Sequence, residues 1–356
     1  MGLVFTPSGQ FAADQAFLRD RLELFLQEQG FSQETGLGAD IRQALAAPRK
    51  LSSLDEPVAS SQNQIPEGIW ALLPWHIARY CAPDADPLLV SRISLCAECF
   101  LCALDLLDDV EDDDETPLRK ELGDARVLNV ATALLALASQ CLLEGTRHGL
   151  APERAIALST ILHQQWLRAT HGQHRDLLSE RQEMQETRPE DCLRIIEEKS
   201  GALVRLVCLL ATSAVGAPAT ITDLFADVGT LVGIAYQLDN DTHDLSNLID
   251  PAFAGEGYNH KSDLVRGKKT LPIVLAQQRY ASRLQKTLIS TGRKQRTELT
   301  MHLQSYHEAI KASVAVGFYY RFRAESILRQ IEDWYGVPVP PCLRFLLSLD
   351  SLPEEA

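Results

Sequence analysis

The sequence has little positive charge, no basic N-terminal segment followed by an apolar one, and no long uninterrupted apolar run. Of its 356 residues, 34 are Lys or Arg and 48 are Asp or Glu, which gives a formal net charge of −14. This shortage argues against a nucleic-acid partner, because phosphate backbones are bound by many basic side chains. The longest apolar run, 201–217, contains Arg205 and is short for a bilayer span. We therefore expect a cytoplasmic protein without a transmembrane segment.

Cysteine spacing gives no clear metal or disulfide framework. The chain has eight cysteines, most of them among apolar residues, as is usual for reduced thiols in a core. Cys96, Cys99 and Cys102 are spaced like ligands of an iron–sulfur cluster. No fourth cysteine lies nearby and no Gly or Pro forms a ligand loop, so we interpret the three as buried helix residues.

Strand patterns are also missing, whereas apolar residues recur at helical spacing along most of the chain. Alternating segments joined by turn dipeptides, which mark hairpins, are essentially absent. The spacing predicts helices at 11–28, 68–82, 88–110, 124–148, 152–182, 188–216, 220–245, 270–282, 296–316 and 318–334. We therefore predict an all-α bundle in a single domain, residues 1–356, with a polar loop at 47–66 and a mobile loop at 246–262.

The segment DLLDDVEDDDE, residues 105–115, ends one of these apolar helices with a dense acidic run. On a helix, Asp108 and Asp112 lie one turn apart on one face, and Asp109 flanks them. Such runs are more often solvated faces, but those normally alternate with basic residues, and none follows before Arg119. Divalent cations convert repulsion between neighbouring carboxylates into coordination. The run is therefore a candidate metal site.

A second oxygen-rich cluster ends another apolar helix. In GIAYQLDNDTHD, residues 233–244, Asn240, Asp241 and Asp244 again lie about one helical turn apart. Two such clusters suggest facing walls of one cavity, in which bridging Mg²⁺ ions bind a diphosphate near the loop at 246–262. The basic residues that would complete such a site are Lys199, Arg119, Lys120 and Lys268.

Five segments, in order, resemble motifs of the trans-isoprenyl diphosphate synthase family, within the class I isoprenoid synthases. They are DDVED at 108–112, GQHRDL at 172–177, KSGALVRLVCLLATSAVGA at 199–217, GIAYQLDNDTHD at 233–244 and DLVRGKKTLPIVLA at 263–276. The resemblance implies an all-α enzyme with a central cavity. It also implies that Mg²⁺ on the two Asp-rich motifs binds an allylic prenyl diphosphate, whose pyrophosphate departs to leave an allylic carbocation.

The resemblance also implies a role for each matching residue. Metal binding is expected of Asp108, Asp109, Asp112, Asn240, Asp241 and Asp244, and catalytic roles of Asp108, Asp109, Asp112, Lys199 and Asp241. Contacts with the allylic diphosphate are expected of Lys199, Gln237, Lys268 and Arg119, and Gln173 and Asp176 are expected to line or support the cavity. Asn240 stands where the family usually has Asp, which removes a charge and weakens that part of the metal site.

The groups with which this family binds its second substrate, isopentenyl diphosphate, are poorly represented. The GKxxRP motif is not recognisable in GIWALLPWHIARY, residues 68–80. Leu101 replaces a histidine, and the displaced pair Arg119-Lys120 replaces two arginines. PRK at 48–50 is a candidate substitute. A diphosphate acceptor needs several paired cations to offset its desolvation, and the sequence does not obviously supply them.

Several fates of the allylic cation therefore stay open. Prenyl transfer to isopentenyl diphosphate is the reaction of the family. The alternatives are cyclisation of one prenyl diphosphate, as in terpene cyclases, and transfer to another acceptor such as a peptide. The DDVED, GQH and ND segments also resemble a bacterial transferase that prenylates a pheromone peptide. A non-catalytic synthase subunit is a further alternative, which the three retained aspartates of the first motif weigh against.

Residues before the first acidic cluster bear on substrate length. Ala103 and Leu104 lie roughly one turn before Asp108, and Phe100 lies about one turn further. The family resemblance implies that a bulky aromatic at this floor stops elongation. An open Ala103 therefore predicts prenyl chains of C15 to C20 or longer, and ordinary core packing is the alternative. The resemblance also implies a homodimer formed through the helices at 88–110 and 124–148.

Overall fold

The structure is a computed structural model that describes residues 7–31, 36–53, 68–181, 186–249, 263, 267–279 and 295–348. These residues form helices and turns with no strand among them, which confirms the predicted all-α class. The chain divides into two compact units. Unit 1 comprises Met1–His163, Leu206–Ala226 and Leu328–Ala356, and unit 2 comprises Gln164–Arg205 and Asp227–Ile327. The single-domain organisation stays a prediction.

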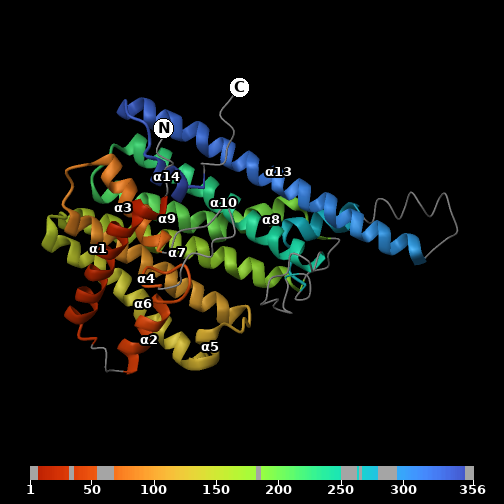
Figure 1. The fold of residues 1–356 in the computed structure, drawn as a ribbon, viewed down its shortest axis with the longest axis horizontal. Helices are drawn as coiled ribbons and strands as arrows, with labels where there is room; N and C mark the ends of the chain where they lie inside the picture. The colour runs from red at the N-terminus through yellow and green to blue at the C-terminus, as the bar shows by residue number, and fades with distance from the viewer. Residues whose placement is uncertain are drawn as a thin grey trace. The chain divides into compact units, whose positions relative to one another are not determined.

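The helices of unit 1 pack around the long helix α4. In chain order they are α1 (Pro7–Glu28), α2 (Gly36–Leu45), α3 (Ile69–Cys81), α4 (Pro87–Glu111), α5 (Pro117–Leu122), α6 (Asp124–Glu144), the 3₁₀ helix η1 (Gly145–His148) and α14 (Pro341–Leu346) (Figure 1). Helix α4 contacts α6, α3, α1 and η1, and α14 contacts α3 and α1. The helix that carries the first acidic cluster is therefore the centre of this unit.

Helix α4 is buried on nearly all sides because its first turns are almost entirely apolar or small. Asp86 caps it by accepting a hydrogen bond from the Leu88 amide, with proline in the first turn. Cys96, Cys99 and Cys102 have no exposed surface, which confirms their interpretation as core residues. The acidic cluster thus ends a helix that the surrounding core holds in place.

Unit 2 combines two short helices with parts of four long ones. Its elements are α8 (Pro189–Ile196), the π-helix η3 (Glu197–Gly201), helical residues 271–279, and parts of α7 (Pro152–Ser179), α9 (Ala202–Ala214), α10 (Ala219–Ile249) and α13 (Gln295–Tyr335). The division between the units falls within these four long helices.

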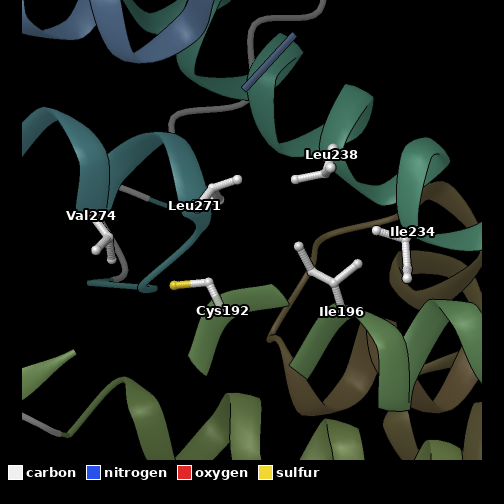
Figure 2. Packing of buried hydrophobic residues seen from close by; sticks show 6 residues of the cluster. All are labelled: Cys192, Ile196, Ile234, Leu238, Leu271 and Val274. Carbon is white, nitrogen blue, oxygen red and sulfur yellow. The ribbon is translucent and has the colours of Figure 1, made fainter. Parts of the chain in front are cut away.

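A small apolar core joins α8, α10 and the helix at 271–279. Its buried members are Cys192, Ile196, Ile234, Leu238, Leu271 and Val274 (Figure 2). The Cys192 thiol also donates a hydrogen bond to the carbonyl oxygen of Lys269 (3.0 Å). This core therefore fixes the start of the 271–279 helix, next to the predicted site residue Lys268.

Two predicted helix boundaries are wrong. The segment 188–216 is not one α-helix, because the wider π turn of η3 separates α8 from α9. The segments 296–316 and 318–334 form one helix, α13, with Gly317 inside it. A side chain at position 317 would lie 3.4 Å from Arg321 and 3.5 Å from Asp239, so the glycine leaves room for the ion pair between these two residues.

The predicted loops are described only in part. Helix α10 continues through 246–249, which the prediction assigned to the mobile loop, and the Ser246 hydroxyl donates to the Thr242 carbonyl there (2.8 Å). Residues 250–262, and 54–66 of the polar loop, lie outside the described residues, whereas 47–53 form turns. The short helices α2, α5 and α14 were not predicted, because six to ten residues give too little periodicity to detect.

Three helical segments are long and apolar enough to cross a membrane, judged by length and composition alone. They are Pro87–Glu111, Asp124–His148 and Ala219–Asn247, and 83%, 50% and 56% of their apolar windows are buried inside the protein. Packing in a large helical core accounts for the first, because a helix that is apolar all round needs apolar neighbours. The absence of a membrane span stays a prediction.

Candidate active site

The first acidic cluster occupies the C-terminal end of α4 in unit 1. Asp108, Asp109 and Asp112 are each partly buried. Burial, together with repulsion from Asp105 and Asp108, raises the pKa of Asp109 to about 6. A divalent cation would relieve this repulsion, and carboxylate oxygens are the ligands that Mg²⁺ prefers. The chemistry of this end of α4 therefore fits the predicted metal.

Arg119 shapes the loop that follows this cluster. Its guanidinium donates to the carboxylates of Asp124 (2.6 Å) and Asp113 (2.9 Å). It also donates to the backbone carbonyls of Asp114 (3.0 Å) and Asp109 (3.4 Å). The hydrogen bonds with Asp124 and Asp113 raise the pKa of Arg119 further. Arg119 thus has an internal structural role, and its contact with substrate stays a prediction.

A charge cluster of the buried Lys50 and Glu98 and the exposed Asp105 lies just before the acidic run, and the sequence did not single out its two acids. The Lys50 ammonium pairs with the Asp105 carboxylate. Glu98 is fully buried and accepts a hydrogen bond from the Leu51 amide (2.6 Å). A detectable signal existed, because Glu98, Asp105 and Asp112 are spaced seven residues apart and so share one face of α4.

Burial by itself lowers the pKa of Lys50 and raises the pKa of Glu98, because it disfavours the charged form of each group. Desolvation alone would lower the pKa of Lys50, but attraction by Asp105 and Glu98 outweighs it and raises that pKa. Burial raises the pKa of Glu98 to about 7, although Lys50 and the Leu51 amide oppose the rise. Lys50 is therefore held as a cation by the carboxylates around it.

Most of the predicted diphosphate-binding residues meet in unit 2. The Oδ2 atom of Asp176, on α7, lies 3.7 Å from Lys199 Nζ and 3.9 Å from Lys268 Nζ. Lys268 is buried, and its Nζ also lies 3.9 Å from Asp263. Two cations from separate segments thus converge on one carboxylate, which is the kind of arrangement that binds anionic oxygens.

Gln237 connects this lysine pair to the second acidic cluster on α10. Its Nε2 donates to Asp241 Oδ1 (2.8 Å), and its Oε1 accepts from the Ser200 hydroxyl (2.7 Å). Asp241 is buried, and burial raises its pKa to about 7, with Asp263 adding to the rise and Gln237 opposing it. Ser200 was not predicted, although it directly follows the predicted Lys199.

The rest of the second cluster is more open. Asp244 accepts a hydrogen bond from the Asp263 amide (3.0 Å), and burial raises its pKa. Asn240 is exposed and lies on a different side of α10 from the buried Asp241, because successive helix residues are about 100° apart. A role for Asn240 in metal binding stays a prediction.

Two glycines bring α7 and α10 close to the π turn that carries Lys199 and Ser200. A Cβ atom on Gly172 would lie 2.4 Å from the Lys199 nitrogen. A Cβ atom on Gly233 would lie 2.6 Å from the Ser200 carbonyl oxygen. Real side chains do not tolerate such distances, so these glycines let three segments approach. Single π turns are frequent at functional sites, and this one aims both polar side chains at the cluster.

The unit 2 group also fits a metal shared with a bound diphosphate. Within the described residues, no three Asp, Glu, His or Cys side chains are placed to hold a metal ion by themselves. The group has more carboxylates than cations, with Asp176, Asp241, Asp244 and Asp263 against Lys199 and Lys268. Both polar atoms of the Gln173 amide are buried without a hydrogen-bond partner in the described part of the chain.

The structure therefore brings the predicted residues together in two groups. Asp176, Lys199, Gln237, Asp241 and Lys268 meet in unit 2. The first cluster lies in unit 1, so the facing of the two clusters across one cavity stays a prediction. Phe100 and Ala103 are buried in the core and Leu104 is partly buried, and their contact with a prenyl chain stays a prediction.

Solved structures with the same fold define the structural class. A geranylgeranyl pyrophosphate synthetase from the archaeon Geoglobus acetivorans is similar with a TM-score of 0.70 and 16% identity, over 96% of each chain. A polyprenyl synthase from Caulobacter crescentus CB15, complexed with calcium and isoprenyl diphosphate, is similar with a TM-score of 0.70 and 18% identity, over 98% of each chain. The chain therefore has the isoprenoid synthase fold.

Sequence comparison gives the family. The polyprenyl synthetase family model matches residues 71–310, so the chain belongs to the polyprenyl synthetase family. A geranylfarnesyl diphosphate synthase from Aeropyrum pernix is 30% identical over 48% of this chain and 53% of its own length. The tryptophan prenyltransferase ComQ from Bacillus spizizenii is 27% identical over 54% of this chain and 60% of its own length. The chain thus matches little more than half the length of these curated relatives.

Proposed function

We propose that the protein ionises an allylic prenyl diphosphate in a Mg²⁺-dependent reaction and transfers the prenyl group, as polyprenyl diphosphate synthases do. The observation that carries this proposal is the group in unit 2, where the partly buried Asp176, Lys199 and Gln237 adjoin the buried Lys268 and Asp241. These residues match the family motifs in order, and their charges suit a diphosphate bound together with a divalent cation.

The chemistry required of the chain is binding and charge stabilisation. Bound Mg²⁺ supplies neutralisation of the diphosphate oxygens as the allylic carbon–oxygen bond breaks. Lys199 and Lys268 donate hydrogen bonds to the same oxygens, whose charge grows as pyrophosphate leaves with the bonding electrons. Gln237 holds Asp241 in a fixed rotamer, so the carboxylate is oriented before the substrate arrives.

We propose a substrate chain of C15 to C20 or longer. The small Ala103 and the partly buried Leu104 precede the first acidic cluster on α4, and Phe100 lies about one turn before Ala103. The geranylfarnesyl diphosphate synthase among the curated relatives supports a long chain. Isopentenyl diphosphate is the first candidate acceptor, since such synthases use it to extend the chain.

A second candidate is transfer to an acceptor without a diphosphate. The relative named as a tryptophan prenyltransferase supports this candidate, because an indole ring is an uncharged nucleophile. The pairing of Lys50 and Arg119 with carboxylates favours it as well. Cyclisation of the prenyl diphosphate is a related possibility. In that reaction the attacking group is a double bond of the prenyl chain itself, which is also uncharged.

The test is metal-dependent pyrophosphate release from farnesyl and geranylgeranyl diphosphate, each with and without isopentenyl diphosphate. Asp241→Asn should lower kcat by about 100-fold or more, because the variant loses a carboxylate proposed to hold the Mg²⁺ that neutralises the leaving pyrophosphate. Asp227→Asn, on the same helix but paired with Arg205 at the surface, should leave kcat nearly unchanged. No release in the presence of Mg²⁺, or full activity of Asp241→Asn, would refute the proposal. Release only after addition of an active synthase would instead indicate a regulatory subunit.

We further propose a homodimer formed through α6. The outward side of this helix carries the exposed Leu128, Ala136 and Leu143 and the partly buried Leu135. The exposed Asn129 and Thr132 are polar, and no residue from 127 to 143 is charged. Leu128 and Leu143 are 41% and 55% exposed, which is unusual for leucines in such an uncharged row. A second copy of the chain is an occupant that would bury this face.

A further inference from the structure

Two adjacent lysines of unit 2, Lys268 and Lys269, are both buried but have different kinds of partner. The ammonium of Lys268 faces charge, since its Nζ lies 3.9 Å from the Asp176 carboxylate. The ammonium of Lys269 instead donates to two backbone carbonyl oxygens, those of Glu180 (3.1 Å) and Gly267 (2.5 Å). Lys269 is therefore bound to the surrounding backbone, whereas Lys268 belongs to the charged group of the candidate site.

The contact between Lys269 and the Glu180 carbonyl attaches this segment to the end of α7. Glu180 directly follows Ser179, the last residue of α7. The last carbonyls of a helix lack amide donors from a following turn, and a cation lies favourably at that end of the helix dipole. Asp176 lies four residues, about one helical turn, before Glu180. Lys269 thus holds its segment to α7 about one turn from the carboxylate that Lys268 faces.

The segment that carries both lysines is fixed at other points as well. Gly267 has a φ of +80°, in the left-handed region, and the Lys268 amide closes the turn by donating to the Asp263 carbonyl (2.9 Å). The Cys192 thiol, on α8 (Figure 2), donates to the Lys269 carbonyl oxygen (3.0 Å). Lys269 therefore connects this segment with α7 through its side chain and with α8 through its backbone.

We propose that Lys269 is a positioning residue that holds Lys268 in place for the diphosphate, an inference that rests on the proposed function. A lysine side chain has several rotatable bonds, so Lys268 reaches a fixed anionic oxygen reliably only if its backbone is also fixed. Loss of the Lys269 ammonium leaves the Glu180 and Gly267 carbonyls without this donor. The segment is then free to move away from α7, and Lys268 moves with it. Lys269 itself does not contact the diphosphate.

Calorimetric titration with inorganic pyrophosphate in the presence of Mg²⁺ tests the inference without relying on turnover. Lys269→Met keeps most of the apolar stem and removes the donors. It should weaken binding by about tenfold, as expected when one charge-assisted hydrogen bond to the ligand is misplaced. Lys268→Met should weaken binding at least as much. The double variant should bind no more weakly than Lys268→Met alone, because Lys269 acts through Lys268.

Arg154→Met is a matched control within unit 1. Arg154 donates to the carbonyl of Ala214, the last residue of α9, so it is another basic side chain at the C-terminal end of a helix (3.3 Å). This variant should bind pyrophosphate like wild type. Lys269→Arg, whose guanidinium can donate to both carbonyls, should recover most of the affinity that Lys269→Met loses. If thermal unfolding shows that Lys269→Met does not fold, Lys269→Gln, with a side chain one bond shorter than lysine, replaces it in the comparison.

Steady-state kinetics give a second readout that loss of stability alone would not produce. With geranylgeranyl diphosphate and Mg²⁺, Lys269→Met should lower kcat for pyrophosphate release more than it raises KM, because Lys268 meets a charge that grows in the transition state. Wild-type pyrophosphate affinity in a folded Lys269→Met protein would overturn the inference. An undiminished effect of Lys269→Met in the Lys268→Met background would also overturn it, because Lys269 would then act independently of Lys268. Absence of pyrophosphate release by the wild-type protein would instead count against the proposed function.

Discussion

Glu98 lies in the middle of an apolar helix and has no exposed surface. Its burial therefore makes the free energy of unfolding depend on pH. Its pKa is raised from 4.5 to about 7 by burial. Between these values the folded protein holds a proton that the unfolded chain has released. The free energy of unfolding therefore falls as pH rises through this window, and the stability present below pH 4.5 is lost above about pH 7.

Glu98→Gln should flatten this dependence. The amide cannot ionise, so a loss of about 3 kcal/mol between pH 4.5 and 7 should disappear from the metal-free protein. Urea unfolding at pH 5, 6, 7 and 8 measures the slope. Glu28→Gln, which removes a half-exposed carboxylate paired with Arg92, serves as the surface control. Identical slopes in wild type and Glu98→Gln would contradict the buried-charge account.

Ala103→Phe tests the proposed substrate length at the scale of one side chain. Position 103 is completely buried. The proposal places the prenyl chain beside it, so the larger ring should reduce the space for that chain. We expect kcat/KM for geranylgeranyl diphosphate to fall by about tenfold or more relative to that for geranyl diphosphate, as one misfitted pocket group typically discriminates. Ala103→Val, which adds less volume, should have a smaller effect. Unchanged discrimination in a folded Ala103→Phe protein would show that Ala103 is ordinary core.

At the scale of elements, the π turn of η3 is held between α7 and α10 by glycine contacts. Gly172 and Gly233 are the first residues of two family motifs, yet helical periodicity gives no reason to single them out. These glycines are needed because η3 packs directly against them. A Cβ atom on Gly172 would lie 2.4 Å from the backbone of Lys199, and one on Gly233 would lie 2.6 Å from the backbone of Ser200. Such contacts depend on the three-dimensional packing, so residue spacing within one segment cannot reveal them.

Gly172→Ala should therefore impair stability and function together. The methyl group must push η3 away from α7, which should lower the free energy of unfolding by about 2 kcal/mol and displace Lys199. Thermal unfolding and the rate of pyrophosphate release measure the two effects. Gly36→Ala, at the start of α2, has no atom within 4 Å of the added carbon and should be neutral or slightly stabilising. Parallel behaviour of the two variants would refute the close-approach explanation.

The sequence predicted the long helices well, but it predicted contacts between distant segments only in part. Long amphipathic or apolar helices such as α4, α6 and α10 were found because their periodicity persists over many turns. The group of Asp176, Lys199, Gln237, Asp241 and Lys268 was assembled through the family resemblance, which orders segments that are distant in sequence. Ser200 and Asp105 escaped because their roles arise from pairing with particular partners, Gln237 and Lys50. The facing of the two acidic clusters stays a prediction.

At the scale of the whole molecule, the exposed apolar row on α6 predicts self-association. Leu128→Glu combined with Leu143→Glu should convert a dimer into a monomer, because burying two carboxylates in an apolar interface is strongly unfavourable. Light scattering coupled to gel filtration gives the mass directly. Ile156→Glu, at another exposed apolar position on α7, should leave the mass unchanged. A wild-type monomer, or a double variant that stays dimeric, would rule out this interface.

The network around Arg119 has a consequence for the entropy of ligand binding. Its guanidinium ties the backbone carbonyls of Asp109 and Asp114 to the side chains of Asp113 and Asp124 before any ligand arrives. The loop after α4 therefore has few backbone torsions left to restrict when metal and diphosphate bind. The acidic run is therefore presented by a chain segment that is already ordered, which lowers the conformational entropy lost on ligand binding.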